Sequence, residues 1–391
     1  MSRLTAIPVG QGDSFYLESD GWSVIVDGGR SRSGFASAFQ KTTQANDVNV
    51  VVCTHNDADH ANGILGFLEA GFSCGEVWLP GRWLGALPSV LRPFVKVFVD
   101  IAANVAEVVA SHGRREGISS IEAYAEELDE SSNDRSTREE GPSVSEDGWP
   151  DSYVEMLEHA EPWEVAPWVQ LWSPEDWPFF PYRHDHRLDP AGVQLLWSAI
   201  DAASRIRAIA IETFQRGIPV RWLEFDAVNP SGGVANLQPV NARQVARVRP
   251  LVGPFLASLA LTVSNKQSLV LWSPPTNRHP GVLFTADSDL SGIRLPCQLT
   301  SAIATAPHHG SEANANAYGA VEVAAGRDSP SLTWVRSDGR YRSRPGPTYL
   351  NLPSRRFCTL CRNPSSSKQA VHLSAQGGCW APQGTYPCQC R

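Results

Sequence analysis

The sequence has no long apolar run and very little lysine. No window approaches about 18 uncharged apolar residues, which excludes a membrane-spanning helix of ordinary length. The first 15 residues lack the apolar core of a signal peptide, so we expect a cytoplasmic protein with reduced thiols. Lys accounts for only four of the 33 basic residues, and 41 acidic residues bring the net charge to −8. This balance argues against a nucleic-acid binder that works by overall charge, although a local basic patch is still compatible with it.

The chain is long and apolar enough to bury a large core. It has 391 residues, of which 42% are hydrophobic and 13 are Trp, so global disorder is excluded. Its length fits two domains or one domain with insertions. Short apolar or β-branched runs predict strands at 7–17 (broken at 10–13), 22–26, 49–53, 77–79, 169–172, 269–272, 282–284, 302–306 and 332–335. Helical spacing of apolar residues predicts helices at 63–70 and 193–214.

Three stretches differ from this pattern. Residues 116–151 are acidic and nearly free of large apolar residues, which predicts a solvated or disordered insertion. Residues 229–241 are rich in Pro, Gly and Asn and predict a linker or long loop. From about Pro353 the chain is rich in Cys, Pro and Ser, and we expect a small separate element there.

The strongest chemical signal is the segment 54–60, Thr-His-Asn-Asp-Ala-Asp-His, directly after a predicted buried strand. It offers four metal ligands in six residues, and imidazole and carboxylate groups suit zinc or manganese. Alternate placement lets His55 and Asp57 take one metal while Asp59 and His60 take a second. The plainer alternative is a polar loop that ends in an Asp-capped helix.

Six ordered motifs resemble those of metallo-β-lactamase-fold hydrolases, most closely the ComEC-like hydrolase domain of DNA-uptake competence proteins. They are VGQGDS (9–14), VIVDGG (24–29), HNDADH (55–60), NKQSLVL (265–271), LFTAD (283–287) and PHHGS (307–311). The resemblance spans residues 6–350, with unmatched insertions between Asp100 and Gln267. It implies an α/β fold, namely a four-layer αββα sandwich. We expect one hydrolase domain over 1–352, with insertions at about 116–151 and 175–262, and a Cys-rich tail over 353–391.

The resemblance also implies a role for individual residues. The metal ligands are His55, Asp57, Asp59, His60, Asp287, which bridges two divalent cations (Zn or Mn), and His308 or His309, which completes one coordination sphere. Asp27 is not a ligand itself and orders the His/Asp loop that carries the ligands. The residues closest to the chemistry are Asp59, His60 and Asp287, because they hold the cations that activate a water.

The sequence departs from the family pattern at two places, one at a metal ligand and one at a residue expected to contact the substrate. The segment 171–174 carries no His where the superfamily often has a ligand, although His184 and His186 follow it. Arg344 stands where ComEC-like domains have a His, and an Arg there can clamp phosphate but cannot donate a proton at neutral pH. We expect Arg342, Arg344 and Ser311 to contact the substrate.

Seven Arg residues follow the last metal motif and form the densest basic stretch of the chain: Arg336, Arg340, Arg342, Arg344, Arg355, Arg356 and Arg362. They predict either a patch that receives a nucleic-acid backbone or a set of surface Arg paired with the acidic insertion.

Five Cys residues crowd the tail: Cys358, Cys361, Cys379, Cys388 and Cys390. A CxxC followed by a CxC favours one structural zinc with a spare thiol, and the alternatives are that the cysteines form no site or that they form disulfides.

Together these features predict a metal-dependent nuclease or phosphodiesterase that acts on DNA or RNA. A small-molecule hydrolase (of a lactam, thioester or cyclic nucleotide) and a non-catalytic binding module are the alternatives, because the fold hosts many functions. A protein partner and a role in defence against foreign DNA are further hypotheses.

Overall fold

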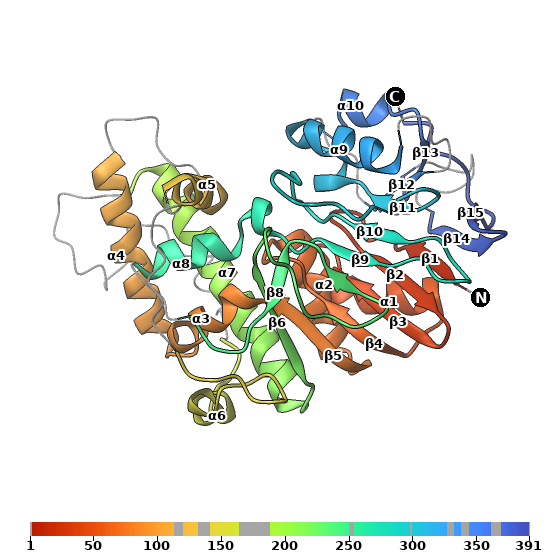
Figure 1. The fold of residues 1–391 in the computed structure, drawn as a ribbon. Coiled ribbons are helices and arrows are strands. Elements are labelled where there is room, and N and C mark those ends of the chain that lie inside the picture. The colour runs from red at the N-terminus through yellow and green to blue at the C-terminus, as the bar shows by residue number, and fades with distance from the viewer. Residues whose placement is uncertain are drawn as a thin grey trace.

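Two β-sheets form the centre of the computed structural model, which describes residues 2–112, 120–131, 141–163, 188–249, 254–297, 299–326, 332–337, 344–360 and 369–390 (Figure 1). Within these residues the first sheet has nine strands in the order β15-β14-β1-β2-β3-β4-β5-β6-β8. The second sheet has six described strands in the order β13-β12-β11-β10-β9-β7.

The strands of the first sheet are β1 (Arg3–Ala6), β2 (Phe15–Ser19), β3 (Trp22–Val26), β4 (Asp47–Val52), β5 (Ser73–Pro80), β6 (Val220–Phe225), β8 (Ala242–Gln244), β14 (Val371–Gln376) and β15 (Cys379–Pro382). Those of the second are β7 (Gln238–Pro239), β9 (Leu271–Ser273), β10 (Val282–Phe284), β11 (Ile303–Thr305), β12 (Thr333–Arg336) and β13 (Arg355–Cys358). Strands β3 to β6 run parallel, as do β10 to β13.

The helices are α1 (Arg32–Thr43), α2 (Ala58–Glu69), α3 (Gly81–Val90), α4 (Phe94–His112), α5 (Ile121–Ser131), α6 (Asp151–Glu158), α7 (Pro190–Gln215), α8 (Phe255–Thr262), α9 (Ala315–Ala325) and α10 (Pro347–Leu350). Short 3-10 turns lie at η2 (Asn265–Gln267), η3 (Pro307–Gly310) and η4 (Glu312–Asn314).

Alternation of side chains along the strands divides the interior into three cores. On β3, Val24 and Val26 face the second sheet, whereas Ile25 faces the helices on the outer side. The core between the sheets joins such residues to Phe284 and Val335 of the second sheet. Helices α1 to α8 contribute to the core outside the first sheet, and α9 and α10 cover the second. The protein is therefore the four-layer αββα sandwich that the sequence predicted.

Most of the predicted elements are present with small shifts of their ends. The run 49–53 is β4, the helix expected at 63–70 is α2, which begins five residues earlier, and the helix expected at 193–214 is α7. Strands β9 and β10 pair antiparallel. The predicted strand 169–172 lies outside the described residues.

The acidic segment 116–151 is not simply solvated, and this expectation is wrong for its described parts. Residues 121–131 form α5, where Ile121, Tyr124 and Ala125 are buried against the outer core. Trp149 packs edge-on against Trp222 at a ring separation of 5.5 Å. The apolar residues recur at helical spacing, so one face is buried while the acidic residues occupy the other.

The C-terminal residues are not separate from the sandwich either. Strand β14 inserts beside β1, and β13 extends the second sheet from β12, so the tail completes both sheets (Figure 1). The signal lies in the alternation of Val371, Leu373 and Ala375, which is typical of a half-buried strand. The predicted insertion 175–262 likewise supplies β6, which pairs with β5 in the first sheet.

Among the described residues, none of the helices combines the length and the apolar character that crossing a membrane requires.

The position of β14 predicts a large stability effect in the tail. Leu373 is fully buried between the sheets, so Leu373→Ala should lower the free energy of unfolding by about 2–5 kcal/mol in urea denaturation of the full chain. Gln376→Ala, on the same strand but exposed, is the matched control. An unchanged global transition for Leu373→Ala would mean that the tail unfolds independently.

Candidate metal centre

The candidate site lies where strands of both sheets end. Asp27 follows β3, the segment 54–60 follows β4, Asp287 follows β10, and His308 and His309 follow β11. Parallel neighbours end at the same edge of a sheet, so the loops after them meet there. The two sheets face each other, and their loops therefore form one cluster of His and Asp side chains.

One half of the cluster is built around two buried imidazoles. The Nε2 atoms of His60 and His309 lie 3.2 Å apart. Asp27 Oδ2 accepts a hydrogen bond from His60 Nδ1 at 2.8 Å, and Asp13 Oδ1 accepts one from His309 Nδ1 at 3.0 Å. Because both Nδ1 atoms are held by carboxylates, both Nε2 atoms are turned toward the same point. Carboxylate–histidine pairs of this kind orient metal-ligating imidazoles in many proteins.

The carboxylate of Asp287 connects this half to a second one. Its Oδ1 lies 3.2 Å from His60 Nε2 and 3.5 Å from His309 Nε2. Its Oδ2 lies 3.9 Å from His55 Nε2 and 3.6 Å from His308 Nε2. The two oxygens of one side chain thus face two different sets of donors.

Further carboxylates complete each half. Asp57 Oδ2 lies 3.7 Å from His55 Nε2, and Asp59 Oδ2 lies 3.5 Å from His309 Nε2. Ligand atoms of Asp13, His60, Asp287 and His309 lie within 4.8 Å of one another, as do those of His55, Asp57 and Asp287.

The donor atoms fit divalent cations. Two ligands bonded to one tetrahedral ion at 2.0–2.2 Å are about 3.4 Å apart, close to the separations observed here. His55 Nε2 is buried and has no hydrogen-bond partner among the described residues. Leaving a buried polar atom unpaired is costly, and a cation would satisfy it. Nitrogen and carboxylate donors are the set that zinc and manganese accept.

The electrostatics of the site also favour positive charge. Burial disfavours the charged imidazole of His60, but Asp287 and Asp27 outweigh it and raise the pKa well above its usual value. Asp287 and Asp13 raise the pKa of His309 in the same way, again against burial. Burial would raise the pKa of Asp287, yet the imidazoles of His309, His308 and His60 hold it well below its usual range.

Asp27 holds the start of the His/Asp loop. Thr54 donates its backbone N–H to Asp27 Oδ1 and its hydroxyl to Asp27 Oδ2, both at 2.8 Å. The same hydroxyl lies 3.0 Å from His55 Nδ1, so it accepts from that ring and turns Nε2 toward the site. One buried carboxylate therefore orients both His55 and His60.

Two glycines explain why the VGQGD and DGG motifs lie so close to α2. A Cβ on Gly12, which has φ +94°, would lie 1.7 Å from the carbonyl oxygen of Asp59. A Cβ on Gly28 would lie 2.4 Å from the backbone nitrogen of Ile64. Only Gly permits these approaches, which bring Asp13 and Asp27 to the first turn of α2.

The alternative of a polar loop with an Asp-capped helix does not hold. Asp57 occupies the N-cap of α2, but within the described part of the chain its side chain accepts no capping hydrogen bond. Its carboxylate lies near His55 instead.

The sequence predicted no role in the site for Asp13. Its signal was the Gly-rich break at 10–13 inside an otherwise apolar strand pattern. Only the tertiary structure places its carboxylate against His309, which is 296 positions further along the chain.

The backbone of His308 and His309 is strained, and a buried Arg holds it in place. Both residues have positive φ values, 45° and 55°, which are uncommon for non-Gly residues and often mark functional sites. Arg336 is fully buried and donates from Nε to the carbonyl oxygen of His309 at 2.6 Å. His308 Nδ1 lies 3.3 Å from Asn314 Oδ1, which leaves Nε2 directed at Asp287.

The predicted Arg patch is only partly a surface feature. Arg336 is buried, Arg355 donates to the carbonyl of Trp380, and Arg356 donates to the carbonyl of Tyr349. Burial removes Arg336 from any surface patch, whereas Arg355 is exposed and Arg356 is half-buried, so these two stay candidates for the patch. Arg340, Arg342, Arg362, His184 and His186 lie outside the described residues.

Two of the predicted substrate contacts lie beside the metal loop. Arg344 is half-buried, and the N–H of Gly346, two residues further on, donates to the carbonyl of Gly310 at 2.8 Å. Ser311 accepts a hydrogen bond from the N–H of Ala313 and so caps η4. A small recess next to His55 is also lined by Arg82, Ser264 and Gln267, among other residues.

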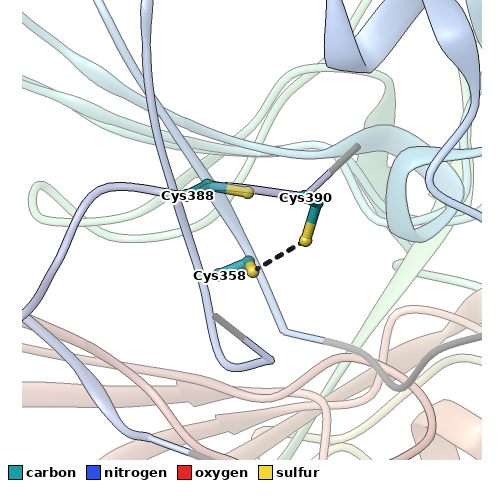
Figure 2. Close-up of side chains that lie close together, drawn as sticks. All are labelled: Cys358, Cys388 and Cys390. Carbon is teal, nitrogen blue, oxygen red and sulfur yellow. Dashed lines mark hydrogen bonds between the residues drawn. The ribbon is translucent and has the colours of Figure 1, made fainter. Parts of the chain in front are cut away.

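Three of the five tail cysteines come together away from this site (Figure 2). They are Cys358, Cys388 and Cys390. Cys379 is exposed on β15 and is not a member of this cluster, in keeping with one spare thiol, and Cys361 lies outside the described residues. The described cysteines form no disulfide.

A sandwich with helices on both faces and His and Asp donors at its strand ends is the architecture of a metal-dependent hydrolase. Residues 7–74 match the family model described as the metallo-beta-lactamase superfamily. This segment contains Asp13, Asp27 and the four donors of residues 55–60. The search of curated proteins finds no match for the chain. The match supports the fold and a hydrolase class and does not identify a substrate.

The raised pKa values predict that metal binding releases protons. The raised pKa values of His60 and His309 mean that each ring holds its second proton to a higher pH than a free imidazole, and a cation that binds Nε2 must displace that proton. Affinity for Zn²⁺ or Mn²⁺ should therefore rise with pH and fall as the imidazoles become protonated. Calorimetry at pH 7 in two buffers of different ionisation enthalpy should show net proton release.

The variant His60→Gln/His309→Gln is the control for this measurement, because its amides carry no titrating proton. Equal proton release from the variant and the unaltered protein would contradict the assignment of the protons to these imidazoles.

Proposed function

We propose that the protein is a two-metal phosphodiesterase that hydrolyses DNA or RNA. The observation that carries the proposal is the position of Asp287, whose two oxygens face two separate groups of His and Asp donors. A single carboxylate shared in this way is suited to bridging two cations. Bound there, the cations would supply a water of lowered pKa and neutralise charge that develops on the attacked phosphate.

The distances favour one ligand set for each cation. His55 and His308 lie nearest to Asp287 Oδ2 and, with Asp57 beside His55, would hold the first. His60 and His309 lie nearest to Asp287 Oδ1 and, with Asp59 beside His309, would hold the second. Both His308 and His309 then serve as ligands, one on each side. His308 takes the place of the His that is missing at 171–174.

The protein's own groups do the remaining work. Asp27 and Asp13 keep the Nδ1 protons of His60 and His309 in place, so that both Nε2 atoms remain donors. Arg336 fixes the backbone of His309 from behind. Arg344 would clamp a phosphate and cannot serve as a proton donor at neutral pH.

Nucleic acid is favoured as the substrate by the similarity of the six motifs to ComEC-like hydrolase domains and by Arg344 beside the metal loop. The small recess next to His55 supports a second candidate, a hydrolase of a small molecule. The alternative of a non-catalytic binding module predicts bound metals without turnover. The nuclease proposal includes a cytoplasmic location and a protein partner in a DNA-processing or defence assembly.

Cleavage of DNA tests the proposal directly. Plasmid and single-stranded DNA incubated with the protein and Mn²⁺ should be cleaved, and Asp59→Asn/His60→Ala should abolish cleavage because it removes two donors of one cation. Asp47→Asn/His159→Ala makes the same chemical changes at exposed positions and should retain activity. Cleavage by the Asp59→Asn/His60→Ala variant, or none by the unaltered protein, would sink the proposal.

The division of ligands makes a prediction that is independent of turnover. In equilibrium dialysis with Mn²⁺, His308→Ala and His309→Ala should each bind one ion tightly instead of two, because each loses a ligand of a different cation. His159→Ala, at an exposed position, should bind two. Two tightly held ions in His308→Ala would show that this residue is not a ligand.

A further inference from the structure

The cysteine cluster lies where the end of the chain returns to the second sheet. Cys358 ends β13, and Cys388 and Cys390 belong to the C-terminal segment, about 30 positions later. The three Sγ atoms lie within 4.8 Å of one another and are turned toward one another (Figure 2). The backbone N–H of Cys388 donates to the carbonyl of Arg356 at 2.6 Å, which fixes the segment beside β13.

The separation of the sulfurs distinguishes the chemistry available to them. A disulfide requires an S–S distance of about 2.05 Å. Two thiolates on one tetrahedral zinc, each at about 2.3 Å from the ion, are about 3.8 Å apart. The Sγ atoms of Cys358 and Cys390 are 3.6 Å apart, close to the second value.

Burial of the cluster is typical of a structural site and not of a reactive thiol. Cys358 is fully buried, and Cys388 and Cys390 are half-buried. A reactive thiol would need an exposed, electropositive environment. By contrast, Cys379 and Cys297 are exposed and lie outside the cluster.

We propose that Cys358, Cys388 and Cys390 bind a structural zinc ion that fastens the C-terminal segment to β13. Three thiolates fill three corners of the tetrahedron and leave the fourth to a further ligand or to water. The site is separate from the cluster around Asp287 and does not depend on the proposed nuclease activity.

The position of Cys358 connects this zinc site to the metal centre. In the register of β12 and β13, Cys358 lies opposite Arg336, and the N–H of Thr359 donates to the carbonyl of Arg336 at 3.2 Å. Arg336 in turn holds the backbone of His309. An ion at Cys358 would therefore fix the strand end that positions a ligand of the other site.

The experiment measures zinc bound by thiolates in the full-length protein purified under reducing conditions. An organomercurial that reacts with thiolates should release one equivalent of zinc per chain, because the His and Asp donors of the other site do not react with it. Substitution by Co²⁺ should give a near-ultraviolet thiolate-to-cobalt charge-transfer band. Cys388→Ser/Cys390→Ser should lose both signals, and Cys379→Ser, the exposed control, should keep them.

Each alternative has its own signature. A Cys358–Cys390 disulfide, detected by mass spectrometry of the freshly purified protein, would overturn the proposal. So would the absence of zinc releasable by the mercurial, or its full retention in Cys388→Ser/Cys390→Ser. Because the mercurial acts on the unaltered protein, the test stands even if a variant fails to fold.

Discussion

The rest of the site depends on the contacts between the carboxylate of Asp287 and the imidazoles around it. It lies buried among four imidazoles, and each of its oxygens faces a different pair of Nε2 atoms. So many donors in so small a volume are stable only if positive charge lies between them, as protons on the imidazoles or as metal ions. The fold supplies the donors from both sheets, so the site also ties the two halves of the sandwich together.

The residues that contact the metal donors hold them in the orientation that the site requires. Asp27 and Thr54 orient His55 and His60, Asp13 orients His309, and Arg336 fixes the strained backbone of the same loop. Each of these contacts joins elements that are distant in sequence. The glycines at positions 12 and 28 make the contacts possible, because any Cβ there would collide with the backbone of α2. The motifs therefore encode close packing as well as chemistry.

The cysteine cluster differs from the metal centre in its donor atoms and in its place in the fold. The metal centre uses nitrogen and oxygen donors at the strand ends, whereas the tail gathers sulfur where β13 meets the C-terminal segment. Arg336 lies between the two, paired with Cys358 in the sheet and bonded to His309. The tail thus belongs to the architecture that supports the metal centre, which explains why it completes both sheets instead of forming a separate element.

The sequence by itself predicted the fold class through the resemblance of its motifs and most of the strands through local alternation. It also predicted the candidate donors of residues 55–60, because these lie adjacent in the chain. It missed helix α5, whose acidic residues mask a buried apolar face, and strand β14, whose pairing with β1 joins opposite ends of the chain. Only the tertiary structure decided which oxygen of Asp287 faces each histidine and that Asp13 supports His309. It also showed that Arg336 is buried and that Cys379 lies apart from the other cysteines. Those facts depend on tertiary contacts, some of them between residues 296 positions apart, which no local pattern of residues specifies.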